Sequence, residues 1–131
     1  MDTLHHVHIF ASDLQKSIAF YRDNFGGEIV LDMELAGARN VFMKIGNGRI
    51  HFYEQPPKSV ERGVVHHIGI QTDEIEQSVK KLKLSGVQIN SEIKEFGLWK
   101  YIMVPAPDNV LIELFQVDFN MLPRELQLYF K

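Results

Sequence analysis

The chain has 131 residues, of which 45% are hydrophobic and 24% charged, and its formal net charge is −3. This is the composition of a soluble globular domain with a sizeable core. The absence of cysteine excludes disulfides, thiolate catalysis and thiolate metal sites. There is no basic stripe and no apolar run of ~18 residues, so neither nucleic acid nor a membrane is an expected partner. Without a secretory signal pattern, a cytoplasmic location is expected.

An internal repeat dominates the sequence. The stretch Leu4–Tyr21, LHHVHIFASDLQKSIAFY, is echoed without a gap from Val65 onward as VHHIGIQTDEIEQSVKKL, and the two His pairs superpose. A second match follows, because Ile50–Glu54 corresponds to Ile112–Gln116 at almost the same offset. An internal repeat constrains the fold, because both copies are expected to adopt the same arrangement of strands and helix. The chain is therefore predicted to be one unit built twice.

The first unit, about 4–55, is predicted to contain four strands and one helix. The expected strands are Leu4–Ala11, Glu28–Glu34, Ala36–Ile45 and Arg49–Glu54. Between the first two, apolar residues recur at helical spacing. Ser12 and Gln15 have the spacing of a capping box at the start of this helix, and Gly26-Gly27 ends it.

The second unit, about 64–117, repeats this order after a proline-containing linker at 56–63. Its expected strands are Val64–Thr72, Gln88–Lys94, Leu98–Val104 and Val110–Val117. Asp73 and Glu76 form a second capping box, and Ser85-Gly86 ends the second helix. The tail, 118–131, is predicted to hold a short amphipathic helix that starts near Pro123.

The fold class that follows is α+β, in one domain spanning 1–131. Each half reads as strand, helix, strand, strand, strand, and such a sheet leaves one face bare. Two βαβββ modules related by pseudo-twofold symmetry, with curled mixed sheets around a metal-binding cleft, would bury their apolar residues. A ferredoxin-like domain with a flat antiparallel sheet is the alternative, which the single clear helix of each half disfavours.

Four residues at repeat-related positions are predicted to form a metal site. Side chains alternate between the faces of a strand, which puts His6 and His67 on the faces opposite the apolar residues. By the same alternation His51 and Glu113 lie on those faces, and these two positions are also equivalent in the repeat. Three imidazoles and a carboxylate suit a divalent ion such as Zn, Ni, Co, Mn or Fe. Alternation places His5, like its equivalent in the second His pair, His66, on the opposite face, where a structural role is expected.

Other residues of the same faces are predicted to contact a small-molecule substrate. They alternate along the strands of both halves, and a role as core residues is the alternative for those of the second half. This set consists of His8, Tyr53, Trp99, Tyr101, Met103 and Phe115.

Three segments resemble the vicinal oxygen chelate superfamily, which includes glyoxalase I, methylmalonyl-CoA epimerase, fosfomycin-resistance proteins, extradiol dioxygenases and bleomycin-binding proteins. They are His6 with 12–21 (SDLQKSIAFY), His67, and 107–114 (PDNVLIEL). The resemblance spans roughly 4–117 and implies that His6, His67 and Glu113 are metal ligands. His51 stands where many members have a Glu or Gln ligand, and its alternative role is that of a hydrogen-bond donor or a general base beside a three-ligand site.

The resemblance implies a metal-dependent lyase, isomerase or epimerase, or dioxygenase that chelates neighbouring substrate oxygens. Phe10 replaces an arginine of glyoxalase I, and His51 replaces its glutamate, so glyoxalase I itself is disfavoured. In the epimerase comparison Glu34 lies where a catalytic base is expected, and Glu113 is the second carboxylate with a catalytic role. The alternative is a non-catalytic binding or antibiotic-sequestering protein, which retention of all four ligand positions disfavours.

A homodimer with sites shared between chains is also predicted. The segment from Glu54 to Val64 is short, and a residue spans at most ~3.3–3.6 Å. Each site would then take His6 and His51 from one chain and His67 and Glu113 from the other.

Overall fold

The computed structural model describes residues 1, 3–61 and 63–130. Arg62 of the predicted linker and Lys131 of the predicted tail lie outside the described residues. The chain divides into two compact units: unit 1 is Met1–Glu61 with Ala106–Asn109, and unit 2 is Arg62–Pro105 with Val110–Lys131. None of the helices in the described part of the chain has the length and apolar character needed to cross a membrane.

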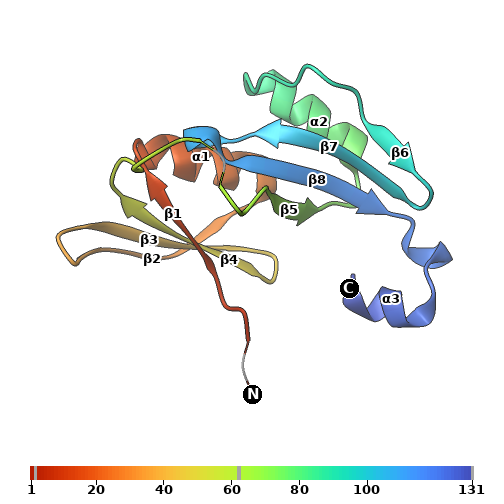
Figure 1. The fold of residues 1–131 in the computed structure, drawn as a ribbon, viewed down its shortest axis with the longest axis horizontal. Coiled ribbons are helices and arrows are strands. Elements are labelled where there is room, and N and C mark those ends of the chain that lie inside the picture. Colours follow the sequence, from red (N-terminus) through yellow and green to blue (C-terminus); the bar gives the residue numbers. More distant parts are fainter. Residues whose placement is uncertain (2, 62, 131) are drawn as a thin grey trace. The chain divides into compact units, whose positions relative to one another are not determined.

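Unit 1 is a four-stranded mixed sheet with one helix on one face (Figure 1). Its elements are β1 (Val7–Ala11), α1 (Leu14–Phe25), β2 (Glu28–Leu35), β3 (Ala38–Ile45) and β4 (Gly48–Glu54). The strand order is β1-β4-β3-β2, in which β1 runs parallel to β4 and the other neighbours are antiparallel. Helix α1 is the crossover that a parallel β1–β4 pair requires.

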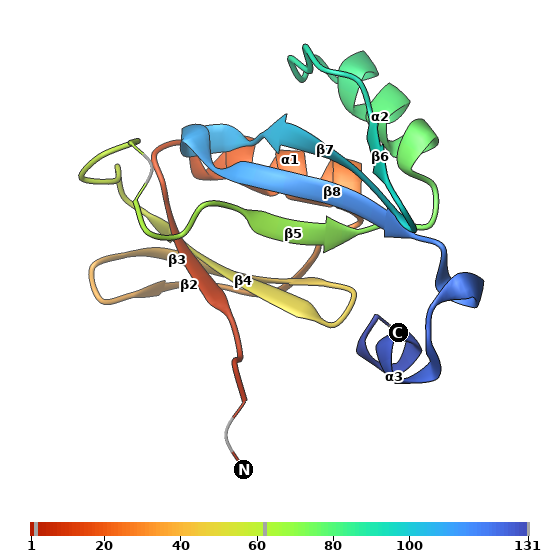
Figure 2. The same cartoon turned by 45° about the vertical axis from the view of Figure 1, so that its right-hand side comes forward.

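Unit 2 repeats this topology, as Figure 2 shows for β5, β8 and β7 lying side by side. Its elements are β5 (Ile68–Gln71), α2 (Ile75–Leu84), β6 (Lys94–Phe96), β7 (Trp99–Pro105) and β8 (Leu111–Val117), then α3 (Arg124–Tyr129). Two 3₁₀ turns, η1 (Pro107–Asn109) and η2 (Phe119–Met121), flank β8. The strand order is β5-β8-β7-β6. The predicted pair of βαβββ modules is thus confirmed, and the single flat antiparallel sheet is wrong.

The core of each unit lies between its helix and one face of its own sheet. The stripe predicted on the first helix is buried, and the equivalent stripe on α2 is buried in the same way. Unit 1 buries Leu14, Ile18, Tyr21, Val41, Met43, Ile50 and Phe52; unit 2 buries Ile75, Val79, Leu82, Ile102, Val104, Ile112 and Leu114. The opposite faces carry the predicted site residues that lie within the strands, Glu34 excepted, because successive side chains of a strand alternate.

The start of α1 differs from the predicted capping box. Asp13, not Ser12, is the N-cap, and its carboxylate accepts a hydrogen bond from the backbone N–H of Lys16. Ser12 is instead bonded to Asp108, through both its backbone N–H and its hydroxyl. The end of the helix is as predicted, because Gly26 takes the left-handed conformation (φ 68°) that glycine adopts at little cost.

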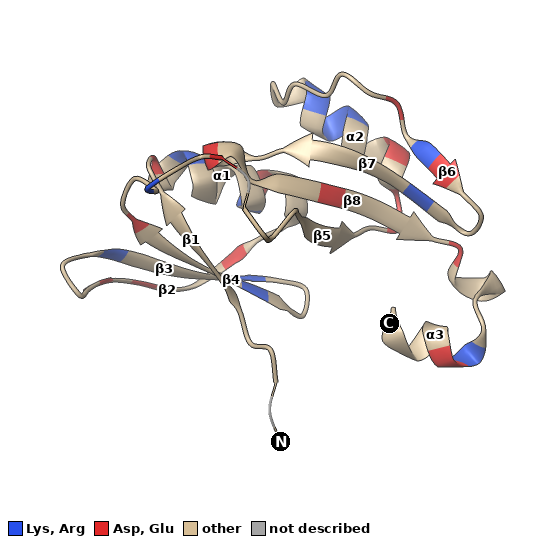
Figure 3. Cartoon of the chain, viewed as in Figure 1, with Lys and Arg blue, Asp and Glu red and all other residues tan. Residues whose placement is uncertain are grey.

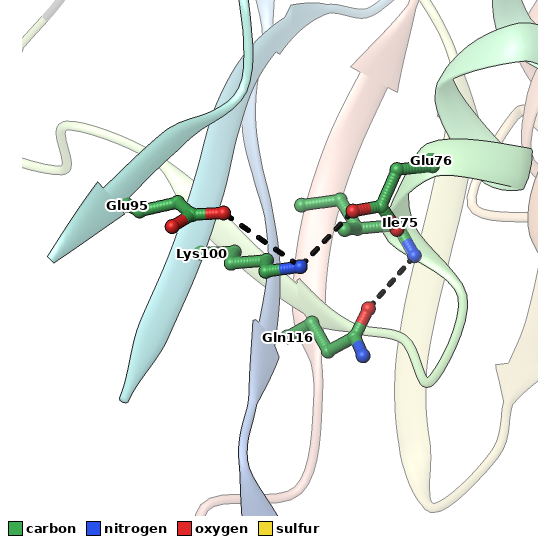
Figure 4. A network of polar contacts seen from close by, with 5 residues as sticks. All are labelled: Ile75, Glu76, Glu95, Lys100 and Gln116. Carbon is green, nitrogen blue, oxygen red and sulfur yellow. Dashed lines mark hydrogen bonds and ion pairs between the residues drawn. The ribbon is translucent and has the colours of Figure 1, made fainter. Parts of the chain in front are cut away.

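The start of α2 also differs from the prediction, because no local side chain caps it. The N-cap residue is Glu74 instead of Asp73, and its side chain makes no capping bond. The backbone N–H of Ile75 donates instead to Oε1 of Gln116 on β8, at 2.9 Å (Figure 4). Nearby, Lys100 of β7 reaches Glu76 of α2 at 3.1 Å. Gln116 of β8 therefore supplies the cap that the local sequence was expected to provide, and the Lys100–Glu76 ion pair is a second contact between sheet and helix.

Several strands differ in extent from the prediction, most of all the first strand of each unit and the second strand of unit 2. The sheet begins at Val7 in unit 1 and at Ile68 in unit 2, so both His pairs precede their strands. The connection between β4 and β5 accordingly runs over 55–67, longer than the predicted linker. The predicted strand 88–94 is wrong except at Lys94, because the strand of this region is Lys94–Phe96. These three residues precede the turn at Gly97 (φ 59°), and they pair with residues 99–101 of the antiparallel strand β7.

Candidate functional site

In unit 1, two of the predicted ligands lie together. His51 of β4 stacks on His6, with 3.7 Å between ring centroids and 16° between planes. On its other side His51 stacks on Phe42 of β3 at 3.8 Å, and these two residues are direct cross-strand partners. The ring of His51 is thus held between Phe42, which the strand register places beside it, and His6, which precedes β1.

His5 belongs to the same cluster, contrary to the prediction that it faces away. The ligand atoms of His5, His6 and His51 all lie within 4.8 Å of one another. Nδ1 of His5 is 3.1 Å from Nδ1 of His6. Strand alternation does not apply here, because both residues precede β1. Sequence reasoning missed this third imidazole, and the adjacency of the two histidines was the available signal.

The His51 imidazole is biased towards its neutral form. Burial is the main cause, followed by repulsion from the charged forms of His6, His5 and His8, and together they lower the pKa of His51. Neutral imidazole is the form that ligates a metal ion. The environment of His51 therefore favours ligation.

In unit 2, the other two predicted ligands are in contact. Nε2 of His67 lies 2.9 Å from Oε2 of Glu113, whose side chain is 17% exposed. Nδ1 of His67 lies 2.9 Å from Nδ1 of His66. Glu113 is the one acidic residue of β8 (LIELFQV), and Figure 3 shows a red band on this strand. Both ring nitrogens of His67 therefore have partners that orient the imidazole.

A pocket of about 640 Å³ opens beside this pair on the same face of unit 2. Three of the predicted substrate-contacting residues, Trp99, Tyr101 and Met103, line it, because they alternate along β7. The full lining is His66, His67, Lys94, Phe96, Trp99, Tyr101, Met103 and Glu113. The positions of His66, Lys94 and Phe96 were not predicted, since β6 was expected earlier in the chain and His66 on the opposite face.

Phe115 is not among the lining residues, but it supports one of them. Its ring stacks on the indole of Trp99 at 4.4 Å, with 6° between planes. The indole N–H of Trp99 donates to Oε1 of Glu113 at 3.1 Å. This hydrogen bond depends on the pairing of β7 with β8, which spacing along the sequence does not specify.

The remaining predicted substrate residues lie on unit 1. His8 and Tyr53 are neighbours on β1 and β4, with 6.1 Å between ring centroids. The Tyr53 hydroxyl donates to the carbonyl of Ala36 at 2.7 Å. Tyr53 therefore ties β4 to the turn between β2 and β3, and His8 is exposed.

Glu34 does not share a sheet face with His51, which corrects its predicted place as a base beside the metal. It is the cross-strand partner of Arg39, and partners of this kind point to the same face. Arg39 alternates with the buried Val41, so Glu34 lies on the α1 side of the sheet, whereas His51 is paired with Phe42 on the other side.

Known proteins resemble this chain in sequence and in fold. The family profile described as Glyoxalase/Bleomycin resistance protein/Dioxygenase superfamily matches residues 3–114. The chain belongs to this superfamily. A mitochondrial methylmalonyl-CoA epimerase of Bos taurus is 30% identical over 128 residues, which cover 86% of this chain and 73% of that protein.

Solved structures of the superfamily share the fold. The fosfomycin resistance protein FosX of Listeria monocytogenes, in complex with Mn(II) and sulfate, matches with a TM-score of 0.72 and 25% identity, covering 88% of this chain and 93% of that one. A domain from Frankia sp. EAN1pec described as glyoxylase/bleomycin resistance protein/dioxygenase matches with a TM-score of 0.77 at 13% identity, covering 89% and 93%, and shows the fold alone.

The pair of predicted ligands in each unit is of a type that binds divalent ions. Each unit presents two of the four predicted ligands in contact on one sheet face: His6 with His51, and His67 with Glu113. Imidazole nitrogen and carboxylate oxygen are borderline to hard donors, which suit Mn, Fe, Co, Ni or Zn.

Proposed function

We propose that this protein is a divalent-metal-dependent enzyme of the superfamily, and that it moves a proton at a carbon atom beside a carbonyl group, as an epimerase does. The observation that carries the proposal is the contact between His67 and Glu113 at 2.9 Å, beside a pocket on the same sheet face. His6 and His51 occupy the repeat-equivalent positions in unit 1. The identity of about 30% with methylmalonyl-CoA epimerase gives the reaction type its support.

The ion would be held by His6, His51, His67 and Glu113. When bound, it would act as a Lewis acid that polarises a substrate carbonyl and stabilises the negative charge of an enolate. The residues of the chain have their own parts. Trp99, Tyr101 and Met103 form an aromatic and thioether wall that excludes water from an apolar acyl group.

Glu113 is the carboxylate in the pocket that could receive the proton. Among the lining residues of unit 2 it is the sole carboxylate, and its Oε2 faces His67. A general base must lie within hydrogen-bond reach of the proton it accepts. In the proposed reaction the substrate C–H bond breaks and its proton goes to the carboxylate of Glu113. A water molecule on the other side then protonates the opposite face of the carbon, which inverts its configuration, and the hydroxide left behind takes up the proton held by Glu113.

The test combines metal analysis with isotope exchange. Protein purified without added metal should contain one divalent ion per chain, and it should introduce solvent deuterium at C2 of methylmalonyl-CoA faster than a protein-free blank. Glu113→Ala should lose both properties. Glu95→Ala, which removes an exposed carboxylate of β6, should retain both. A wild-type protein that cannot be loaded with a stoichiometric ion would overturn the proposal.

A second candidate reaction is supported by the FosX structures, which match at 25% identity over most of both chains. One FosX structure contains Mn(II) and 1S,2S-dihydroxypropylphosphonic acid, the diol that forms when water opens the epoxide of fosfomycin, and this opening is the candidate reaction. Incubation of the metal-loaded protein with fosfomycin, followed by phosphorus NMR, distinguishes the two. Loss of the epoxide signal without deuterium exchange into methylmalonyl-CoA would favour this candidate.

We also propose that the enzyme is a homodimer. Large apolar side chains are exposed just before one edge strand of each sheet: Leu4 (93%) before β1, and Val64 (104%) and Val65 (75%) before β5. Exposed apolar groups at edge strands are typical of surfaces that another chain covers. Sites shared between two chains remain the arrangement that we propose, although the long 55–67 connection removes the argument from linker length.

A further inference from the structure

The carboxylate of Glu113 has a different partner for each oxygen. Oε2 lies 2.9 Å from Nε2 of His67, and Oε1 accepts the indole N–H of Trp99 at 3.1 Å. The two contacts come from opposite sides of β8, one from the segment before β5 and the other from β7. A carboxylate with both oxygens engaged in this way cannot rotate freely.

The indole is itself held on two sides. Phe115 of β8 stacks on its face at 4.4 Å, and Phe130 meets it edge-on, with 5.5 Å between ring centroids and 72° between planes. The backbone of Phe130 is tied to the sheet in turn, because its carbonyl accepts a hydrogen bond from Nε2 of Gln71 on β5 at 3.0 Å. The segment that follows β8 thus returns to the site face of unit 2 and clamps Trp99.

We propose that Trp99 is a positioning residue for Glu113, clamped by Phe115 and Phe130. This inference rests on the proposed function and deepens it. The indole N–H can donate but not accept, and it carries no charge. It therefore engages Oε1 and turns Oε2 towards His67, the neighbouring predicted ligand.

The competing interpretation is that Trp99 serves as an apolar wall of the pocket and nothing more. Under that interpretation, phenylalanine should replace it without consequence for the metal site. Under the proposal, loss of the N–H frees Oε1, and the carboxylate loses its fixed orientation. Partners that orient metal ligands in this way are typically worth 10–100-fold in metal affinity or activity.

The first experiment tests the hydrogen bond in the metal-free protein. Trp99 is the only tryptophan of the chain, so ¹⁵N-labelled protein gives a single indole N–H signal in NMR. Glu113→Ala should shift this signal and accelerate its exchange with water. The matched variant Glu95→Ala should leave it in place. An indole signal that does not respond to Glu113→Ala would overturn the proposed contact.

The second experiment measures Zn(II) binding by calorimetry with the full chain stripped of metal. Trp99→Phe keeps an aromatic ring in the clamp but lacks the donor, and its Kd for Zn(II) should rise by about tenfold or more. Tyr129→Phe is the control, since it removes a polar group from an exposed aromatic residue of the same unit. Its Kd should match that of the wild type. Thermal unfolding of both variants verifies that they fold.

The two failures are distinguishable. If the wild type binds one Zn(II) and Trp99→Phe binds it within twofold of the same Kd, the positioning role of Trp99 is overturned and the proposed metal site stands. If the wild type itself binds no Zn(II), the proposed function is overturned, and the role of Trp99 with it.

Discussion

The imidazoles of His6 and His51 lie nearly parallel at 3.7 Å, although the two residues belong to different segments of unit 1. His5 joins them, with its ligand atom within 4.8 Å of theirs. Three histidines are therefore available where the repeat predicted two ligands. The repeat favours His6 and His51, because these two have the equivalents His67 and Glu113 in unit 2.

Exchange of single histidines should reveal which of them bind the ion. His51→Ala should weaken Zn(II) binding by more than about tenfold, since even partners that merely orient ligands contribute 10–100-fold. His5→Ala should change the affinity by less than about threefold, because we assign His5 a role in holding His6. Calorimetry on metal-free protein measures both. Equal losses in the two variants would show that His5 is a ligand.

Glu34→Gln should leave metal content and deuterium exchange near their wild-type values. The reason is the register of β2, which puts Glu34 beside Arg39 on the face turned towards α1. Exchange at C2 of methylmalonyl-CoA is the measurement, with Glu113→Ala as the inactive comparison. A loss of exchange of about a hundredfold in Glu34→Gln, with metal retained, would restore Glu34 as the base.

Mixing two inactive chains tests the shared site. A His6→Ala chain and a Glu113→Ala chain should each bind no stoichiometric metal. If sites are shared, a heterodimer of the two has one intact and one doubly broken site, so the mixture should regain up to one ion per heterodimer. Mass spectrometry under native conditions measures heterodimers and bound metal together. Proven subunit exchange without regained metal would show that each site belongs to one chain.

Two tyrosines form a matched pair for stability. Tyr21 is 1% exposed, and its hydroxyl has no hydrogen-bond partner among the described residues, so Tyr21→Phe should be neutral or stabilising by up to about 1–3 kcal/mol. Tyr53→Phe removes the hydrogen bond to the carbonyl of Ala36 and should destabilise by about 0.5–1.5 kcal/mol. Denaturant unfolding at neutral pH measures both changes.

The same variant of Tyr21 should alter the response to alkali. Burial, with a smaller contribution from the Asp108 carboxylate, raises the pKa of Tyr21 far above its ordinary value of 10.0. The folded state thus keeps its proton where the unfolded chain loses it, and the free energy of unfolding falls as pH rises above about 10. Tyr21→Phe should flatten this decline. Identical pH profiles for wild type and variant between pH 9 and 11 would contradict the assignment.

The architecture was predictable from the sequence because its signals are local. The duplicated His-pair segments, the helical stripe of Leu14, Ile18 and Tyr21, and the glycine at the end of α1 depend on residues close together in the chain. Hydrophobic periodicity and turn chemistry report on such short segments. The repeat extended this information over the whole chain, and it singled out the four candidate ligands before any contact was known.

The tertiary structure decided which side chains meet. Alternation in β2 is interrupted by an irregularity between Ile29 and Leu31, and this one-residue shift moves Glu34 to the α1 face. The Trp99–Glu113 hydrogen bond, the Phe130 clamp and the Gln116 cap of α2 likewise join residues from different elements. Their contacts depend on the register between strands and on how the chain after β8 returns to the sheet. The spacing of residues within one segment specifies neither the strand register nor the path of this chain. A register shift of one residue turns every side chain of a strand to the other face of the sheet.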